Sequence, residues 1–289
     1  MSEATIQRLP TKSMWKYFHL LRAVVRFHDY NPQHVSMDSV ARWMKQFKSK
    51  GDLKLACSLL KRVIYFSEAE TKKILLQQNN ALMDDLQKVG LATRKLIYLQ
   101  TDDAGSSSPM MLGMLRNSAG LEQRGCKLLD GRDAMGINAE TRKREQGAII
   151  YIDDFVGSGK QFERARNFAQ QSVVGTFSEF LLVPSICEEG YAKLTKMGVT
   201  VYSGHIHSKA ERPLHDHSHL MTEEDRKRLI AICKEIRPNT ALGYEDMATM
   251  VVIYRNAPNS IPAILRGSDK QQPFYGLFPR FKDLPIKKV

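Results

Sequence analysis

The sequence predicts an α/β fold in which a helical domain, residues 1–92, precedes a domain with a central parallel sheet, residues 93–289. Two patterns support this division. Before residue 92, apolar residues recur about every 3.6 positions, as they do on one face of a helix. After it, short apolar runs alternate with longer amphipathic segments, as in repeated strand–helix units whose strands pair in parallel.

Cap residues mark where two of the N-terminal helices begin. Ser36 or Asp38 can cap the second helix, and Ser67 with Glu70 three positions later forms a capping box for the last. The predicted helices cover residues 13–27, 36–47, 53–65 and 68–89. Short helices with a basic excess are typical of winged-helix modules, but no wing hairpin is evident, so a plain helical adaptor is the alternative.

The composition excludes several classes of protein. Of 289 residues, 43% are hydrophobic and 26% charged, which is typical of a globular chain. No apolar run reaches the roughly 18 residues that a membrane-spanning helix needs, and residues 1–16 lack the pattern of a signal peptide. The four cysteines have no metal-ligand spacing and indicate free thiols in a reducing cytoplasm.

The net charge of +12 is concentrated toward the N-terminus. Residues 1–96 contain 17 Lys+Arg and 8 Asp+Glu, and 17 − 8 gives +9 of that total. This asymmetry predicts a surface for a polyanion, most simply nucleic acid. The alternative is a solvated basic helical surface with no such partner.

The stretch from Ala148 to Gln161 carries the clearest chemical pattern. An apolar strand ends at Asp153 and Asp154, and a loop with Gly157, Ser158, Gly159 and Lys160 leads into a helix from Gln161. The loop amides and the helix dipole can converge on one phosphate. Acids at the strand end can hold ribose hydroxyls or a hydrated Mg²⁺. We therefore expect Asp153 and Asp154 to be the catalytic and metal-associated residues, and Gly157–Gln161 to bind a ligand phosphate.

This stretch has two other interpretations. Gly159-Lys160 matches the end of the phosphate loop of nucleotide hydrolases, but Asp154 stands where that loop needs Gly, and Gln161 where it needs Ser or Thr. The second is an ordinary strand–turn–helix with solvated acids. Adjacent acids at a strand end are costly without a ligand, which favours a ribose-phosphate site.

A second loop of small and hydroxyl-bearing residues follows the predicted strand Arg94–Leu99. It contains Ser106, Ser107 and Ser108, directly before Pro109, which suits the first position of a helix. The stretch Ala148–Gln161 resembles a type I phosphoribosyltransferase signature, and this resemblance implies that the loop with the serines contacts a pyrophosphate group. The loop contains no Lys or Arg, however, and a flexible linker is the alternative.

The polar segment 130–147 directly precedes the site strand. It is longer than most connections, which favours a mobile lid or disorder over a tight turn. On closure, Arg142, Lys143 and Arg144 would neutralise a leaving pyrophosphate; otherwise they are solvated.

Five of the eight histidines lie between His205 and His219. The run His215-Asp216-His217-Ser218-His219 could surround Zn²⁺, although no two-histidine helix motif is present. The alternative is a polar loop of hydrogen-bonded or solvated histidines.

The central pattern resembles the phosphoribosyl-diphosphate signature of type I phosphoribosyltransferases, with Val156–Lys160 in place of the usual Thr- and Gly-rich loop. Three further pieces, Trp43–Phe47, Ala257–Pro262 and Leu277–Arg280, extend the similarity. With them the chain resembles the phosphoribosyltransferase-like effectors of prokaryotic conflict systems, which occur beside retron reverse transcriptases. This resemblance implies a winged-helix-like domain joined to a type I phosphoribosyltransferase-like domain.

Two functions from different classes follow. The first is a toxin of an antiviral defence system such as a retron, acting with Mg²⁺ on a ribose-phosphate such as phosphoribosyl diphosphate or a nucleotide, by chemistry at the glycosidic bond. The alternative is a non-catalytic nucleotide sensor or nucleic-acid-binding module that docks on a reverse transcriptase complex through residues 1–92. The lack of a cation near Ser106–Ser108 favours the second function, and Lys160 with Arg142–Arg144 favours the first.

Overall fold

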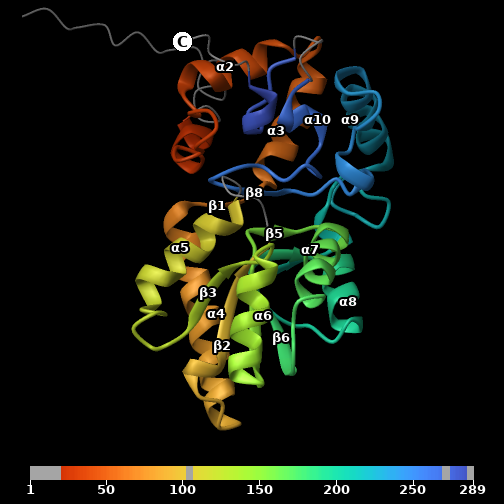
Figure 1. The fold of residues 1–289 in the computed structure, drawn as a ribbon. Helices are drawn as coiled ribbons and strands as arrows, with labels where there is room; N and C mark the ends of the chain where they lie inside the picture. The colour runs from red at the N-terminus through yellow and green to blue at the C-terminus, as the bar shows by residue number, and fades with distance from the viewer. Residues whose placement is uncertain (1–20, 102–106, 269–273, 285–289) are drawn as a thin grey trace, which may run out of the picture.

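The computed structural model describes residues 21–101, 107–268 and 274–284. It consists of a lower body built on a six-stranded sheet and an upper body of helices around a two-stranded sheet (Figure 1). The red–orange and blue ends of the ribbon meet in the upper body, so both ends of the chain contribute to it.

All strand pairs in the larger sheet are parallel. Its strands are β2 Leu96–Gln100, β3 Lys127–Asp130, β4 Gln146–Ile152, β5 Phe155–Val156, β6 Thr176–Cys187 and β7 Thr200–His207. Strand β4 lies between β2 and β6, and β5 pairs with the last part of β6. Gln100 lies opposite Ile152, so Thr101 and Asp153 emerge at the same edge of the sheet. The predicted α/β class with a central parallel sheet is confirmed.

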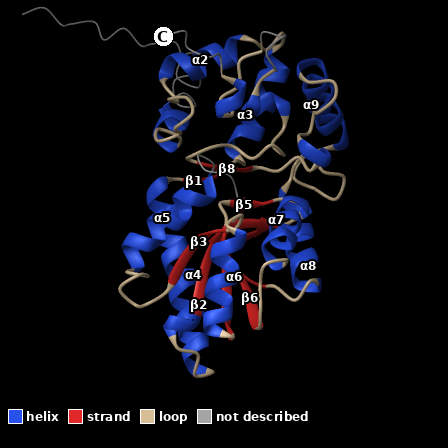
Figure 2. Ribbon diagram, viewed as in Figure 1, coloured by secondary structure: helices blue, strands red, loops and turns tan. Residues whose placement is uncertain are grey.

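Helices cover both faces of this sheet (Figure 2). They are α4 Glu68–Lys88, α5 Ser107–Ala119, α6 Ala134–Arg144, α7 Lys160–Gln170 and α8 Glu188–Lys196. Ile150 of β4 belongs to the core beneath α4 and α5, whereas Ile149 and Tyr151 belong to the core beneath α6, α7 and α8. Burial on both faces explains why β4 is apolar without alternation.

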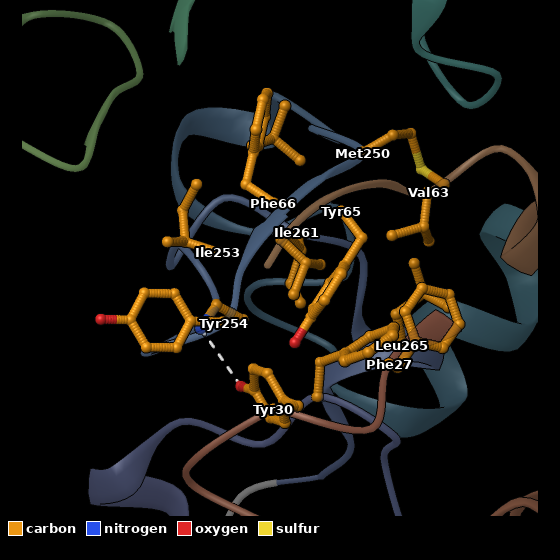
Figure 3. Close-up of a cluster of buried hydrophobic side chains, with 14 of the residues drawn as sticks. Phe27, Tyr30, Val63, Tyr65, Phe66, Met250, Ile253, Tyr254, Ile261 and Leu265 are labelled. Atoms are coloured by element: carbon orange, nitrogen blue, oxygen red, sulfur yellow. Dashed lines mark hydrogen bonds between the residues drawn. The ribbon is translucent and has the colours of Figure 1, made fainter. Parts of the chain in front are cut away.

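The upper body is assembled from segments far apart in the sequence. Its elements are α2 Met37–Lys45, α3 Lys50–Lys61, β1 Ile64–Phe66, α9 Glu223–Ile236, β8 Val251–Ile253 and α10 Ala263–Arg266. Strand β1 pairs with β8 in parallel. Side chains from both ends, including Phe27, Tyr65 and Tyr254, share one apolar core (Figure 3). The winged-helix character and the boundary at residue 92 stay predictions.

The element boundaries differ from the predicted ones in two informative places. The last part of the predicted helix 53–65 belongs to β1, where aromatic and β-branched residues pair with β8. Single turns of 3₁₀-helix occur at Thr93–Lys95, Lys209–Glu211, Tyr244–Asp246 and Phe281–Asp283. In the part of the chain that the structure describes, no helix is both long and apolar enough to cross a membrane.

Candidate functional site

The two acids lie at the carboxyl end of β4, where the sequence predicts them. Asp153 is buried, with 6% of its surface exposed, and its carboxylate accepts hydrogen bonds from the Thr101 hydroxyl at 3.1 Å and the Asp154 amide at 2.8 Å. Asp154 is half-buried and lines a cavity. Asp153 is thus held in one orientation by its neighbours, while Asp154 is positioned beside the space that a ligand would enter.

The loop after the acids is a strand–turn–helix connection shaped by glycine. Gly159 is the N-cap of α7 and has a φ of 78°, in the left-handed region that favours glycine. It provides no side-chain cap, so the first amides of α7 are not satisfied by the N-cap residue. A Cβ on Gly190 of α8 would lie 2.4 Å from the carbonyl oxygen of Gly157. The loop therefore packs directly against the backbone of α8.

The two acids and the loop that follows them both line one cavity of about 180 Å³. One wall is formed by Asp153, Asp154, the loop Gly157–Gly159 and the start of α7. The opposite wall comes from the C-terminal part of the chain and consists of Tyr244, Met247, Asn256, Ala257, Pro258, Asn259, Ser260 and Arg280. We call this set the C-terminal wall. The sequence singled out Ala257–Pro262 and Leu277–Arg280 only as carriers of the family resemblance, so their place at the site is new.

Lys160 does not line the cavity, although it lies in the predicted phosphate loop. Its ammonium forms an ion pair with Glu245, whose neighbours Tyr244 and Met247 belong to the C-terminal wall. Lys160 and then Ser158 hold the pKa of the Glu245 carboxyl below its usual range. Glu245 and Asp246 have φ angles of 54° and 51°, which is strained backbone for residues with a Cβ. A carboxylate of the chain itself thus lies against the loop that we expect to bind a phosphate.

The family model PRTase-CE matches residues 40–280. The chain belongs to the PRTase-CE family. This match spans the sheet, the two acids and the C-terminal wall, and it confirms the expected phosphoribosyltransferase-like domain. A comparison with curated proteins gives no match.

Among solved structures, the PRTase-CE chain is similar to three proteins. Orotate phosphoribosyltransferase from Aeropyrum pernix is 15% identical over 48% of this chain and 70% of its own, with a TM-score of 0.32. Hypoxanthine-guanine phosphoribosyltransferase from Schistosoma mansoni, in complex with IMP, is 10% identical over 49% and 68%, with a TM-score of 0.32. The AQ2163 protein from Aquifex aeolicus is 10% identical over 56% and 86%, with a TM-score of 0.34.

The three serines of the second loop differ in position and in hydrogen bonding. Ser106 lies outside the described residues, and Ser107 is the first residue of α5. Ser108 is fully buried: its hydroxyl donates to the Ile152 carbonyl at 2.6 Å and accepts from the Thr101 amide at 2.8 Å. Ser108 therefore ties the ends of β2 and β4 together, and its predicted contact with pyrophosphate finds no support in these bonds.

Most of segment 130–147, for which the sequence predicts a mobile lid or disorder, is the helix α6. Asp133 caps it, and Ile137 and Thr141 are fully buried. Only a narrow face of this helix is apolar, so its sequence lacks the broad apolar stripe that predicts a helix. Arg142, Lys143 and Arg144 form its last turn and precede the seven-residue strand β4, which spans about 20 Å. They thus lie at the opposite edge of the sheet from Asp153.

Two histidines gather in a different place from the predicted run. Ligating atoms of His205, His207 and Glu211 lie within 4.8 Å of one another, whereas no such group in the described residues includes His215 to His219. The Met250 amide, however, donates to Nε2 of His207 at 3.0 Å, which leaves the ring proton on Nδ1 facing Glu211 at 3.6 Å. A metal at Nδ1 would have to remove that last proton. The hydrogen bond therefore favours a polar link between β7 and the start of β8 over a metal site.

The residues at the cavity fit a magnesium ion only in part. Both acids line the cavity, and both oxygens of Asp153 already accept hydrogen bonds from the chain. Mg²⁺ commonly binds one or two carboxylates and completes its shell with water and substrate phosphates. These residues suit an ion shared with a phosphorylated ligand, and not one held by the protein alone.

Proposed function

We propose that this PRTase-CE protein binds a ribose 5-phosphate unit in the cavity at the end of β4. The phosphate would lie on Gly157–Gln161, and the ribose hydroxyls would donate to Asp153 and Asp154. The observation that carries this proposal is the convergence of acids and helix start on one cavity. Carboxylates accept hydroxyl protons, and the N-terminus of a helix favours an anion, so the two ends of a sugar phosphate match the two ends of this site.

We propose that the chemistry occurs at the anomeric carbon of this ribose. The bond to a base or to pyrophosphate would break, the leaving group would take the bonding electron pair, and a nucleophile would then attack the carbon. The intermediate stage is oxocarbenium-like, and a carboxylate beside it stabilises the developing positive charge. We assign this role to Asp154, which is half-buried and lines the cavity. Mg²⁺, when bound with the ligand, would neutralise phosphate charge.

We propose a biological role from the resemblance described above. The protein would act as a toxic effector of an antiviral defence system such as a retron, consuming a nucleotide or phosphoribosyl compound. A partner complex containing a reverse transcriptase would hold it inactive. Profiling the metabolites of cells that express the protein tests this role, because a single nucleotide or phosphoribosyl pool should fall when the protein is released from control.

The binding site itself is tested by replacing both acids. The double variant Asp153→Asn, Asp154→Asn should lose calorimetric binding of ribose 5-phosphate and lose toxicity while unfolding at a temperature close to the wild type. Asp216→Asn is the control, since that side chain is 87% exposed and lies outside the cavity. Wild-type affinity in the double variant would show that the two acids are not the site.

A second function, nucleic-acid binding, is favoured by the surface of the first helices. The exposed cations on or beside α2 and α3 are Arg42, Lys45, Lys48, Lys50, Lys54 and Lys61. The acids on the same helices are Asp38 and Asp52, and Asp52 is buried against Arg228. We propose that this basic surface docks on nucleic acid within the controlling complex. Replacing Lys45, Lys50 and Lys54 with Ala should lower the salt dependence of binding by about one unit for each phosphate that the variant no longer neutralises; salt-independent binding, or none, would contradict it.

A further inference from the structure

Arg280 is the cation of the C-terminal wall, and its guanidinium has an unsatisfied donor. It lines the same cavity as Asp153 and Asp154. Its Nε is buried and has no hydrogen-bond partner within the described residues. Two hydrogen bonds fix the backbone at Arg280. The Arg280 amide donates to Asp283 at 3.3 Å, and the preceding Pro279 carbonyl accepts from the Tyr30 hydroxyl at 2.8 Å. A buried guanidinium donor with no partner is costly, and this one belongs to a side chain that lines the cavity.

Asp283, whose carboxylate accepts from the Arg280 backbone amide, is already engaged by other guanidinium groups. Both oxygens of Asp283 accept from the guanidinium of Arg266, at 2.7 and 2.9 Å. Arg237 lies 3.6 Å from the same carboxylate. Arg266 and Arg237 are themselves buried beside this carboxylate, in a region of low dielectric. The charge of Asp283 is therefore directed mainly at Arg266 and Arg237.

The pKa of the Arg280 guanidinium reflects its burial and its charged neighbours. Burial and then the Arg266 charge lower its pKa, while Asp154 across the cavity raises it. The protein therefore places a cation where its own structure disfavours one, near the acid that we assign to the ribose hydroxyls. Residues retained against stability in this way are typical of binding sites.

We propose that Arg280 is a ligand-binding residue that pairs with a second anionic group of the ligand, distinct from the phosphate on the loop Gly157–Gly159. This inference rests on the proposed function. The ligand class is then a ribose 5-phosphate with a further phosphate or diphosphate on the hydroxyl-bearing side of the sugar. A guanidinium suits such a group because it forms paired, charge-assisted hydrogen bonds with phosphate oxygens. The interaction would also supply the cation that the loop around Ser106–Ser108 lacks.

Two probes that differ by one phosphate test this assignment: ribose 5-phosphate and ribose 1,5-bisphosphate, titrated calorimetrically into the full chain. Arg280→Met keeps the bulk of the side chain and removes the charge. It should weaken binding of the bisphosphate about 10- to 100-fold and that of the monophosphate by less than about 3-fold. Arg280→Lys should recover part of the difference. Arg255→Ala is the matched control, because Arg255 stacks on the Phe281 ring at 4.6 Å and does not line the cavity.

Thermal unfolding separates a binding role from a structural one. Because Arg280 adds a buried positive charge beside Arg266, Arg280→Met should unfold at the same temperature as the wild type or a higher one. A lower unfolding temperature with equal losses for both probes would overturn the proposal, as would unchanged affinity for the bisphosphate while the monophosphate still binds. If the wild type binds neither probe, the proposed function fails together with this inference.

Discussion

Glu245 offers a test of whether the loop Gly157–Gly159 is an anion site, because its carboxylate already lies there. It pairs with Lys160 at the first position of α7, and Lys160 and Ser158 both lower its pKa. A ligand phosphate on the loop would interact with the same Lys160 ammonium and with the same N-terminus of α7. We therefore expect the charge of Glu245 to compete with the phosphate, and Glu245→Gln to tighten binding of ribose 5-phosphate.

The size of the effect follows from the exposure of the pair. The Lys160 side chain is 57% exposed and that of Glu245 is 27% exposed. Solvent-screened pairs of this kind are weak, so the expected affinity gain is roughly 1.5- to 5-fold. The gain should shrink at high salt, since screening weakens both the pair and the repulsion. Free ribose, which has no phosphate, should bind both proteins equally.

Calorimetric titration at low and at high salt measures this difference. Glu163→Gln is the control, because Glu163 is also in the first turn of α7 but pairs with Lys193 at 2.5 Å. The same variant has a pH signature. A lowered folded-state pKa means that Glu245 stabilises the protein above its unfolded-state pKa and that this stabilisation disappears as the pH falls through the folded-state pKa. Glu245→Gln should therefore be slightly less stable than the wild type at neutral pH and equal to it in acid. Unchanged or weaker phosphate binding would refute the competition.

Two substitutions, at Tyr30 and Gly190, and one pH series test residues that support the cavity or the stability of the fold. Tyr30→Phe removes a hydroxyl that donates to Pro279 and accepts from the Ala257 amide at 3.1 Å, so stability should fall by about 1–3 kcal/mol in urea unfolding and the bisphosphate should bind more weakly; unchanged values would show that the C-terminal wall does not depend on it. Gly190→Ala should displace the Gly157 carbonyl, which a Cβ would approach to 2.4 Å, and weaken phosphate binding more than it alters the circular dichroism spectrum. Burial lowers the pKa of His207 to about 4, so the unfolded state binds more protons below pH 6.5 and stability should fall between about pH 6.5 and 4, by up to roughly 1.4 kcal/mol per pH unit; His207→Gln should flatten that slope.

The sequence was sufficient for the parts of the site that are local. An uninterrupted apolar run predicts β4 because a strand buried on both faces has no alternation, and glycines after the two acids predict a tight turn into α7. Those signals depend only on neighbouring residues. The family match over residues 40–280 agrees with this part of the prediction.

The parts that the sequence did not predict depend on long-range contacts. Strand β1 exists because Ile64–Phe66 pairs with Val251–Ile253, and a three-residue strand has no periodicity of its own. Helix α6 has the sequence pattern of a polar lid because only Ile137 and Thr141 are buried in it. No sequence motif marks Arg280 or Glu245 as a site residue, because each reaches the site only when segments distant in the sequence fold together.

The hydrogen bonds of the upper body connect its basic helices to the cavity. The Trp43 indole donates to the Ile264 carbonyl at 2.9 Å, and Gln46 holds the Tyr275 backbone through both ends of its amide. The Tyr30 hydroxyl accepts from the Ala257 amide and donates to the Pro279 carbonyl, next to Arg280, so it holds two parts of the C-terminal wall. A partner that displaced α2 would have to break the bonds of Trp43 and Gln46 to the C-terminal part of the chain. We therefore expect a partner bound at the proposed basic surface to change the affinity of the cavity for its ligand without contacting the cavity, which calorimetric titration with and without nucleic acid would measure.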